Sequence, residues 1–384
     1  MNPPSFPARP TRARRPALLA LAALSAALCA HAVAPAPPCA TAGGWDAACL
    51  RAAYHREIAD WPRPEGVDRP DWREMAPVPT LPRPDQPAAL VALGERLFND
   101  PRLSRSDMLA CISCHRPTHG FADTQAVSSG HEGRLGTRNT PTVLGAGHAS
   151  SLFWDGRAPT LEAQATGPIA HPDEMAMPLD ELPAKLAALD DYPAAFARAF
   201  GDEPATADQP AVSLARVAAA LAAYQRTLLP PETRFDRFLA GQRDALDDRE
   251  LLGLHLFRTK ARCMSCHDGA LLSDGRFHNL GLTWYGRKYE DLGRYAVTGE
   301  PADVGRFRTP TLRQVAHTGP WMHNGRFPAL RGVLNMYNAG MPRPKPANDE
   351  QARDPLFPQT SELLQPLQLD QAELDALEAF LGVL

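Results

Sequence analysis

Two short stretches of the chain place two cysteines and a histidine at the same spacing, Cys111-Ile-Ser-Cys114-His115 and Cys263-Met-Ser-Cys266-His267. Two thiols three positions apart can form thioethers to the two vinyl groups of one porphyrin, and the histidine that follows then ligates the iron. The alternative is a pair of redox dithiols or half zinc sites, each with an incidental histidine. Because the pattern occurs twice, we interpret the chain as one that carries two covalently bound c-type haems.

The N-terminus supports this interpretation, since c-type haem is attached after export. Residues 1–34 contain an arginine-rich start, an apolar run from Ala17 to Ala30 and an Ala30-His31-Ala32 sequence that resembles a signal cleavage site. The run is shorter than the roughly 20 apolar residues that a membrane span needs. We therefore expect a cleaved signal peptide and a periplasmic protein, with an uncleaved membrane anchor as the alternative.

The composition narrows the classes of function. The chain has 384 residues, of which 44% are hydrophobic and 22% charged, so it can bury a sizeable core. Its net charge of -4 offers no basic stripe to neutralise phosphates, which argues against nucleic acid as a partner. Outside the two motifs, Cys29 lies in the export signal, while Cys39 and Cys49 fit either a short-loop disulfide or two unrelated free thiols.

Apolar periodicity predicts a mainly α-helical fold. Helices are expected at 87–98, 179–200, 212–229, 247–257, 328–337 and 370–384. Asp370 and Glu373 would form a capping box at the start of the last helix. The helices at 87–98 and 247–257 lead into the two cysteine motifs, which suggests two related cytochrome c-like halves.

The expected domain organisation follows from this repetition. A proline-rich extension at 35–86 is expected to wrap the surface, because it has no core pattern of its own. A first haem domain is placed at 87–230 and a second at 231–384. Long irregular loops follow both motifs, and loops of this length in compact domains are usually functional.

Six further segments lie around and between the motifs. They are Phe153-Trp-Asp-Gly-Arg-Ala-Pro-Thr-Leu-Glu-Ala-Gln-Ala-Thr-Gly-Pro-Ile-Ala-His-Pro-Asp-Glu-Met175, Gly136-Thr-Arg-Asn-Thr-Pro-Thr142, Phe277-His-Asn-Leu-Gly281, Asp291-Leu-Gly-Arg294, Arg308-Thr-Pro-Thr-Leu-Arg313 and Trp321-Met-His-Asn-Gly325. Together they resemble the bacterial di-haem cytochrome c peroxidase and MauG-like family over residues 87 to 384. The resemblance implies that the first motif holds the low-potential, peroxidatic haem and the second the high-potential, electron-storing haem.

The resemblance also assigns roles around the first haem. Glu174 matches the family's distal acid, which can move a proton between the two oxygens of peroxide. Gln164 matches a neutral neighbour that can hydrogen-bond peroxide or water, and Pro168 matches another distal position. Trp154 matches an aromatic residue between the haems, which offers a step for electron transfer. A solvated surface carboxylate and a packed core tryptophan are the alternatives for Glu174 and Trp154.

Two candidate iron ligands separate the branches of the family. His131 matches a histidine that, in the peroxidases, ligates the first haem at rest and leaves when the second haem is reduced; a mobile surface loop is the alternative. Tyr337 matches the distal ligand of the second haem, which is methionine in most peroxidases and tyrosine in MauG-like enzymes. Met336 is adjacent, so both residues stay open as ligands, with the tyrosine preferred.

The resemblance implies further ligands and partners. The family holds a calcium ion, and its ligands match the Asn139 side chain and the carbonyls of Thr318 and Pro320. The implied activity is reduction of hydrogen peroxide to water with electrons from a small cytochrome c or cupredoxin. A MauG-like oxidase of a partner protein's side chain is the alternative that Tyr337 supports. A non-catalytic electron carrier is disfavoured, because it needs no distal acid. A homodimer stays an open expectation.

Overall fold

The computed structural model of the chain describes residues 39–79, 86–201 and 210–384. These residues fall in one compact unit, Ala36–Leu384. The export signal expected at 1–34, with Cys29, lies outside the described residues. Within the described ranges no helix combines the length and the apolar character that crossing a membrane requires.

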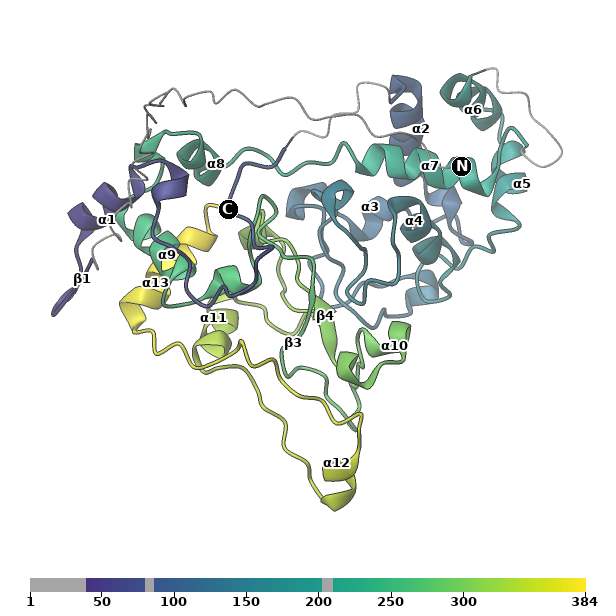
Figure 1. Ribbon diagram of the computed structural model, residues 1–384. Helices are drawn as coiled ribbons and strands as arrows, with labels where there is room; N and C mark the ends of the chain where they lie inside the picture. The colour runs from purple at the N-terminus through teal and green to yellow at the C-terminus, as the bar shows by residue number, and fades with distance from the viewer. Residues whose placement is uncertain (1–38, 80–85, 202–209) are drawn as a thin grey trace, which may run out of the picture. The chain divides into compact units, whose positions relative to one another are not determined.

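The fold is mainly helical, as predicted (Figure 1). In the described ranges the α-helices are α1 (Ala47–Tyr54), α2 (Ala88–Asn99), α3 (Cys111–Cys114), α4 (Leu161–Ala170), α5 (Leu182–Ala187), α6 (Tyr192–Phe200), α7 (Leu214–Gln225), α8 (Arg234–Leu239), α9 (Asp248–Arg258), α10 (Tyr295–Thr298), α11 (Leu330–Asn338), α12 (Asp349–Arg353) and α13 (Gln371–Leu381). The strands form two antiparallel pairs, β1 (Ala40–Thr41) with β2 (Gly44–Trp45) and β3 (Phe277–Asn279) with β4 (Arg306–Arg308).

Most predicted helices are confirmed to within a few residues. At the start of α13, the Asp370 side chain accepts a hydrogen bond from Glu373 N and the Glu373 side chain accepts one from Asp370 N, which is the predicted capping box. The single helix predicted at 179–200 is wrong, because the chain forms α5 and α6 there. Pro193 stands in the first turn of α6 and has no N–H to continue a helix that comes from α5.

Each cysteine motif follows a helix that contacts a partner helix across a glycine. A Cβ atom on Gly94 of α2 would lie 1.9 Å from the Ala220 carbonyl oxygen on α7. A Cβ atom on Gly253 of α9 would lie 2.1 Å from the Ala376 carbonyl oxygen on α13. The backbones of each helix pair therefore meet directly, and only glycine fits at the contact. Figure 1 shows the two pairs on different sides of the unit.

The helices enclose two main hydrophobic cores. Helices α2, α4, α6 and α7 form one of them, in which Leu97 and Phe196 are fully buried. The other is formed by α1, α8, α9 and α13, with Tyr54, Phe257 and Phe380 buried at its centre. Each core therefore lies behind one of the two cysteine motifs. The domain boundary near residue 230 stays a prediction.

The proline-rich extension joins the second core instead of wrapping the surface as predicted. Tyr54 is fully buried there, because α1 packs its apolar face against α9. Glu74 of the extension forms an ion pair with Arg258 of α9 at 2.5 Å. Cys39 and Cys49 form a disulfide with their Cα atoms 5.5 Å apart, which decides between the two alternatives that the sequence leaves open. The extension is thus built into the half that carries the second motif.

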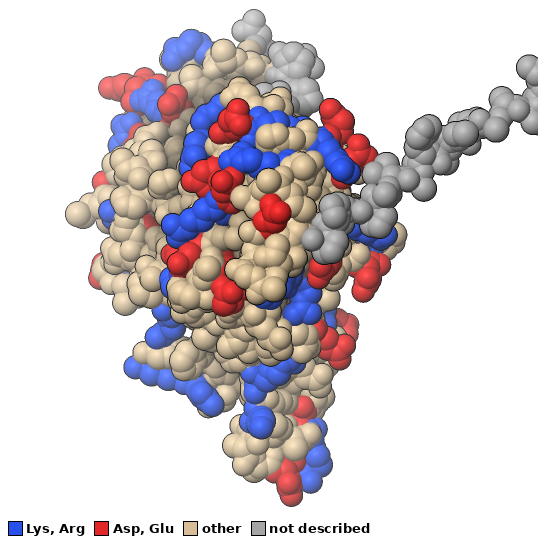
Figure 2. Space-filling model, turned by 90° about the vertical axis from the view of Figure 1, so that its left-hand side faces the viewer, with Lys and Arg blue, Asp and Glu red and all other residues tan. Residues whose placement is uncertain are grey.

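Charged side chains of both signs lie among uncharged ones on the face shown in Figure 2. Partly exposed side chains of the chain form ion pairs, such as Arg51 with Asp248 and Arg331 with Asp375, each at 2.6 Å. On that face neither sign forms a continuous stripe. The pattern agrees with the small net charge of -4.

Candidate functional site

The histidines of the two motifs are oriented alike. His115 Nδ1 lies 3.0 Å from the Phe121 carbonyl oxygen, and His267 Nδ1 lies 2.9 Å from the Leu272 carbonyl oxygen. Because a carbonyl can only accept, each Nδ1 carries the hydrogen and each Nε2 keeps a free lone pair. Burial lowers the pKa of both imidazoles, which favours the neutral form that ligates metal. Each histidine lines a cavity together with the cysteines of its motif.

The motif cysteines carry no disulfide and lie at the walls of these cavities. Burial raises the pKa of Cys111 and of Cys263 to about 12. A reactive dithiol does the opposite, since its surroundings stabilise the thiolate and lower the pKa. The environment of these thiols therefore fits thioether attachment better than a redox dithiol.

The cavity at the first motif has a volume of about 850 Å³. Gln164, Pro168 and His171 line it from one side of α4 and its C-terminal end, because residues four and three positions apart share a helix face. Glu174 lines the same cavity from the turn that follows, in which its N–H donates to the His171 carbonyl at 3.0 Å. The structure thus brings Glu174, Gln164 and Pro168 to the cavity that also contains His115.

Glu174 has the electrostatic environment of a proton-transfer group. Burial raises its pKa, while His171 and Arg157 act in the opposite direction and do not cancel the effect. The nearer of these two, His171, has its Nδ1 4.0 Å from a Glu174 carboxyl oxygen. A carboxyl with a raised pKa can hold and release a proton closer to neutral pH than an ordinary glutamate.

His131 reaches this region through its backbone and not through its imidazole. Its N–H donates to the Glu174 carbonyl at 2.7 Å, and a Cβ atom on Gly130 would lie 2.0 Å from the Asp173 carbonyl oxygen. Gly130 lines the cavity, whereas the His131 side chain does not. Its Nδ1 is buried with no hydrogen-bond partner among the described residues. A role as a reversible ligand stays a prediction, and this loop would have to move for it.

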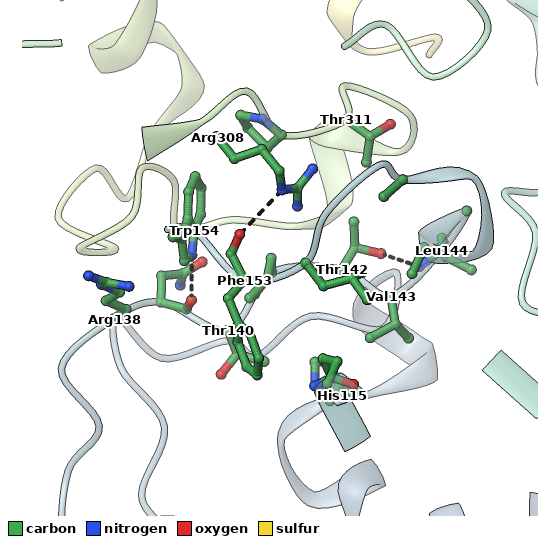
Figure 3. Close-up of a pocket in the computed structure, with 18 of the residues that line it drawn as sticks. His115, Arg138, Thr140, Thr142, Val143, Leu144, Phe153, Trp154, Arg308 and Thr311 are labelled. Carbon is green, nitrogen blue, oxygen red and sulfur yellow. Dashed lines mark hydrogen bonds between the residues drawn. The ribbon is translucent and has the colours of Figure 1, made fainter. Parts of the chain in front are cut away.

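Trp154 lines both cavities, and Figure 3 shows its indole among the lining residues of one of them. Its Nε1 donates to the Asn139 carbonyl at 2.8 Å, which fixes the indole. The ring packs edge-on against His323, with the centroids 6.4 Å apart. The structure therefore places the predicted aromatic residue between the two candidate haem sites.

The cavity at the second motif is smaller, about 200 Å³. Leu330, Leu334 and Tyr337 line it from one face of α11, at the spacing of successive helical turns. Met336 points elsewhere, because the next position on a helix is turned by about 100°. The methionine that does line this cavity is Met322. Of the two candidate ligands, the structure places Tyr337 at the site and Met336 outside it.

The three predicted calcium ligands, Asn139, Thr318 and Pro320, all line the second cavity. Asn139 is buried, and its Nδ2 donates to the carbonyls of Gln125 and Ala126 at 3.3 and 3.2 Å. This leaves its Oδ1 as the atom that could ligate a cation, which is the donor type that Ca²⁺ prefers. The calcium ion and its binding by these three residues stay a prediction.

Three residues that line these cavities have no role that the sequence motifs predict. Met322 and His323 line the second cavity, and Arg308 lines both. His323 is buried and stacks on Phe307 with the ring centroids 3.6 Å apart. All three belong to segments that carry the family resemblance, but only the folded arrangement shows which of their side chains face a cavity.

The comparisons with known proteins come from both branches of one family. A family profile described as "Di-haem cytochrome c peroxidase" matches residues 88–244. Cytochrome-c peroxidase IdrP1 of Denitromonas iodatirespirans is 39% identical over 303 residues, which cover 69% of this chain and 77% of that protein. The methylamine utilization protein MauG of Methylorubrum extorquens is 38% identical over 305 residues, which cover 78% of each.

Solved structures agree with the sequence comparisons. The crystal structure of a MauG-like protein associated with microbial copper homeostasis matches with a TM-score of 0.67 at 31% identity. The match covers 82% of this chain and 94% of that one. Both halves of the chain therefore share the fold of that protein.

Proposed function

The chain belongs to the di-haem cytochrome c peroxidase and MauG family, and we propose that it is a periplasmic peroxidase that reduces hydrogen peroxide to water with electrons from a small redox protein. The observation that carries this proposal is the first cavity, where Glu174, with its raised pKa, lies on the wall that also holds Gln164. A protein that only carries electrons has no use for a proton-transfer group beside its iron.

The residues that would hold the two haems are the cysteines and histidines of the motifs. When bound, the haem supplies an iron that takes up electrons and at which the O–O bond of peroxide is cleaved. The Glu174 carboxylate can accept the proton of one peroxide oxygen and return it to the other, which makes water the leaving group. Gln164 can hold peroxide or product water by hydrogen bonds. Each peroxide consumes two electrons and two protons and gives two waters.

Electrons from the donor must cross from the second half to the first. Trp154 lines both cavities, and its hydrogen bond to Asn139 keeps it in place. The indole can therefore serve as a step between the two haem sites. A small cytochrome c or a cupredoxin is the donor that we propose. We further propose that a calcium ion, bound through Asn139 Oδ1 and the carbonyls of Thr318 and Pro320, stabilises the wall shared by the cavities.

A MauG-like oxidation of a partner protein's side chain is a second candidate. It is favoured by one observation, which is that Tyr337 lines the second cavity while Met336 does not. A phenolate oxygen is a hard ligand that stabilises ferric and higher oxidation states, whereas a thioether favours the ferrous state. The two candidates differ in the source of the two electrons, which is a soluble donor in one case and a protein side chain in the other.

Steady-state kinetics of the protein with both haems attached would test the proposed function. We expect hydrogen peroxide to be consumed with oxidation of two equivalents of a reduced c-type cytochrome or a reduced cupredoxin. The measurement follows donor absorbance and peroxide concentration together. Peroxide-dependent bleaching of the haems without oxidation of either donor would contradict the proposal, and oxidation of a partner protein under the same conditions would favour the second candidate.

A further inference from the structure

Arg308 lies at the junction of the two haem cavities and lines both of them. It ends β4, and its backbone N–H donates to the Trp154 carbonyl at 2.7 Å. Figure 3 shows the guanidinium in the cavity, where its Nε donates to the Phe153 carbonyl at 3.3 Å. Its Nη1 donates to the Thr309 carbonyl at 3.4 Å. The side chain is therefore aimed at the space between the two motifs by contacts with backbone only.

No acidic side chain among the described residues pairs with Arg308, in contrast to the other arginines of the first cavity. Arg138 pairs with Asp155 at 2.6 Å and with Asp291 at 2.7 Å. Arg157 pairs with Asp155 as well, at 3.0 Å. Among the described residues, Arg308 forms no ion pair, and both of its side-chain hydrogen bonds are long. A cation in this position requires an anion that the polypeptide does not supply.

Burial makes the unpaired charge of Arg308 energetically unfavourable. Arg308 is only partly exposed, and it lines both cavities. Burial lowers the pKa of Arg308, with no neighbouring carboxylate to raise it. An unpaired buried charge is strongly unfavourable unless hydrogen bonds and a counter-charge compensate it. A planar guanidinium with free donors is best compensated by a carboxylate, which it binds with two parallel hydrogen bonds.

We propose that Arg308 is a carboxylate-binding site shared by the two haems, at which it holds propionate groups of both. A porphyrin that is attached to cysteines through its vinyl groups keeps its two propionates as free carboxylates. The first cavity contains the cysteines of one motif and the second those of the other, while Arg308 borders both. The inference rests on both cavities holding haem, and it does not depend on which substrate the protein turns over.

One shared cation has a consequence that two separate ones would not have. A positive charge beside the propionates stabilises the reduced, more negative form of each haem and so raises both reduction potentials. Removing it should therefore lower both potentials together. Arg308 also binds the carbonyls of Phe153 and Trp154, so the same residue connects the propionates to the chain segment that carries the indole.

The test compares Arg308→Gln and Arg308→Lys with a matched control, Arg294→Gln. Arg294 also lacks an ion pair among the described residues and also donates to backbone carbonyls, those of Asp155 and Gly156 at 2.8 and 3.0 Å. It does not line either cavity. Spectroelectrochemical titration of the purified di-haem proteins would give both potentials, and a pyridine haemochrome assay would give the haem content per chain.

We expect two haems per chain in all three variants and a shift of both potentials to more negative values in R308Q. In R308K both should shift in the same direction but less, because lysine keeps the charge and loses the planar fork. R294Q should have wild-type potentials. If R308Q does not accumulate as a folded di-haem protein, R308K decides alone, and wild-type potentials for both of its haems would overturn the inference.

Two further outcomes would contradict the shared site. A shift confined to one haem in R308Q would show that the arginine serves one propionate pair only. Wild-type potentials combined with lost peroxide turnover in R308Q would show that it binds an anionic reactant instead. Failure of the proposed function is distinguishable from both outcomes. If the wild-type protein had no peroxidase activity, R308Q would still lower the reduction potentials of both haems.

Discussion

The two motif cavities have the same floor and different walls. At both floors, the motif histidine donates from Nδ1 to a backbone carbonyl and lies beside buried thiols. The wall of the first cavity carries Glu174, Gln164 and His171, which can bind and exchange protons. The wall of the second is mostly apolar, with Tyr337 as its phenol and with His278 and His323 among its polar residues. The haem motif therefore fixes which cofactor is bound, and the walls determine what each iron can do.

The supports behind the cavities differ as well. The first is held by α2, α4, α6 and α7, and two of its loops meet at Gly130 and Asp173. The second is held by a core to which the N-terminal extension contributes Tyr54 and Trp61. The half expected to react with peroxide thus depends on loop contacts, and the half expected to store an electron is embedded in a larger core. Substitutions at each half should separate these properties.

Replacing Glu174 with Gln should have the largest effect on the chemical difference between the two cavities. The amide cannot exchange a proton with peroxide, so we expect peroxide turnover to fall by about 100-fold or more. The spectrum of the second haem and the content of two haems per chain should stay unchanged. Stopped-flow kinetics with a reduced cytochrome c would measure the loss. Glu181→Gln is the matched control, because Glu181 is exposed and does not line the cavity. Equal peroxide turnover in Glu174→Gln and Glu181→Gln would show that proton transfer by Glu174 does not distinguish the two cavities.

Low pH should destabilise the first half of the chain through Asp100, which directly follows α2. Burial raises its pKa, but hydrogen bonds from Arg102 and Tyr192 outweigh this and lower the pKa to about 2. Because the folded pKa lies below the ordinary value of 3.8, the ionised carboxylate contributes stability that is complete above about pH 4 and is lost as the pH falls towards 2. The contribution is roughly 2 kcal/mol.

Hydrogen exchange in α2 and α9 would test this difference in support. Asp100→Asn should reduce the protection of α2 at pH 7 by an amount close to that contribution, and it should flatten the pH dependence below pH 4. Helix α9 serves as the internal reference, because Asp100 makes no contact with it. Equal loss of protection in both helices would mean that Asp100 supports the unit as a whole.

Sequence predicts the floors of the cavities better than their walls. Both motifs are local, and the helices that lead into them have clear apolar faces, so each can be predicted from a short window. The walls join distant segments, as at Trp154 and Arg308, and residue types alone do not show that these side chains meet. The choice between Met336 and Tyr337 depends on the rotation of α11, which a shift of one residue in its placement would reverse. The apolar pattern does not predict the break between α5 and α6, because it continues across Pro193.

Gly130→Ala should disturb the first wall without replacing any proton-transfer side chain. Its new Cβ atom would lie 2.0 Å from the Asp173 carbonyl oxygen, so the loop that carries Glu174 must move. We expect about a 10-fold loss of peroxide turnover with both haems retained, since small misplacements of a reacting group are costly. Gly136→Ala in the same loop is the matched control, because its Cβ atom would meet its nearest neighbour at an ordinary 3.7 Å. Similar kinetics for the two variants would show that the loop contact does not position Glu174.

Tyr337→Phe should leave peroxide chemistry at the first wall intact and change the second haem alone. Only Tyr337 of the two neighbouring candidates lines the second cavity, so its loss should alter the ligand-sensitive bands in the optical and EPR spectra of that haem, and Met336→Leu should not.

Met322→Leu is the informative third variant, because Met322 also lines this cavity. If the spectrum responds to M322L and not to Y337F, the ligand is a thioether, which favours Fe(II) and makes the second haem an electron store of the peroxidase type. A response to Y337F instead gives that iron a hard oxygen ligand. The difference between the two halves would then lie in the oxidation state that each wall stabilises, as well as in proton transfer.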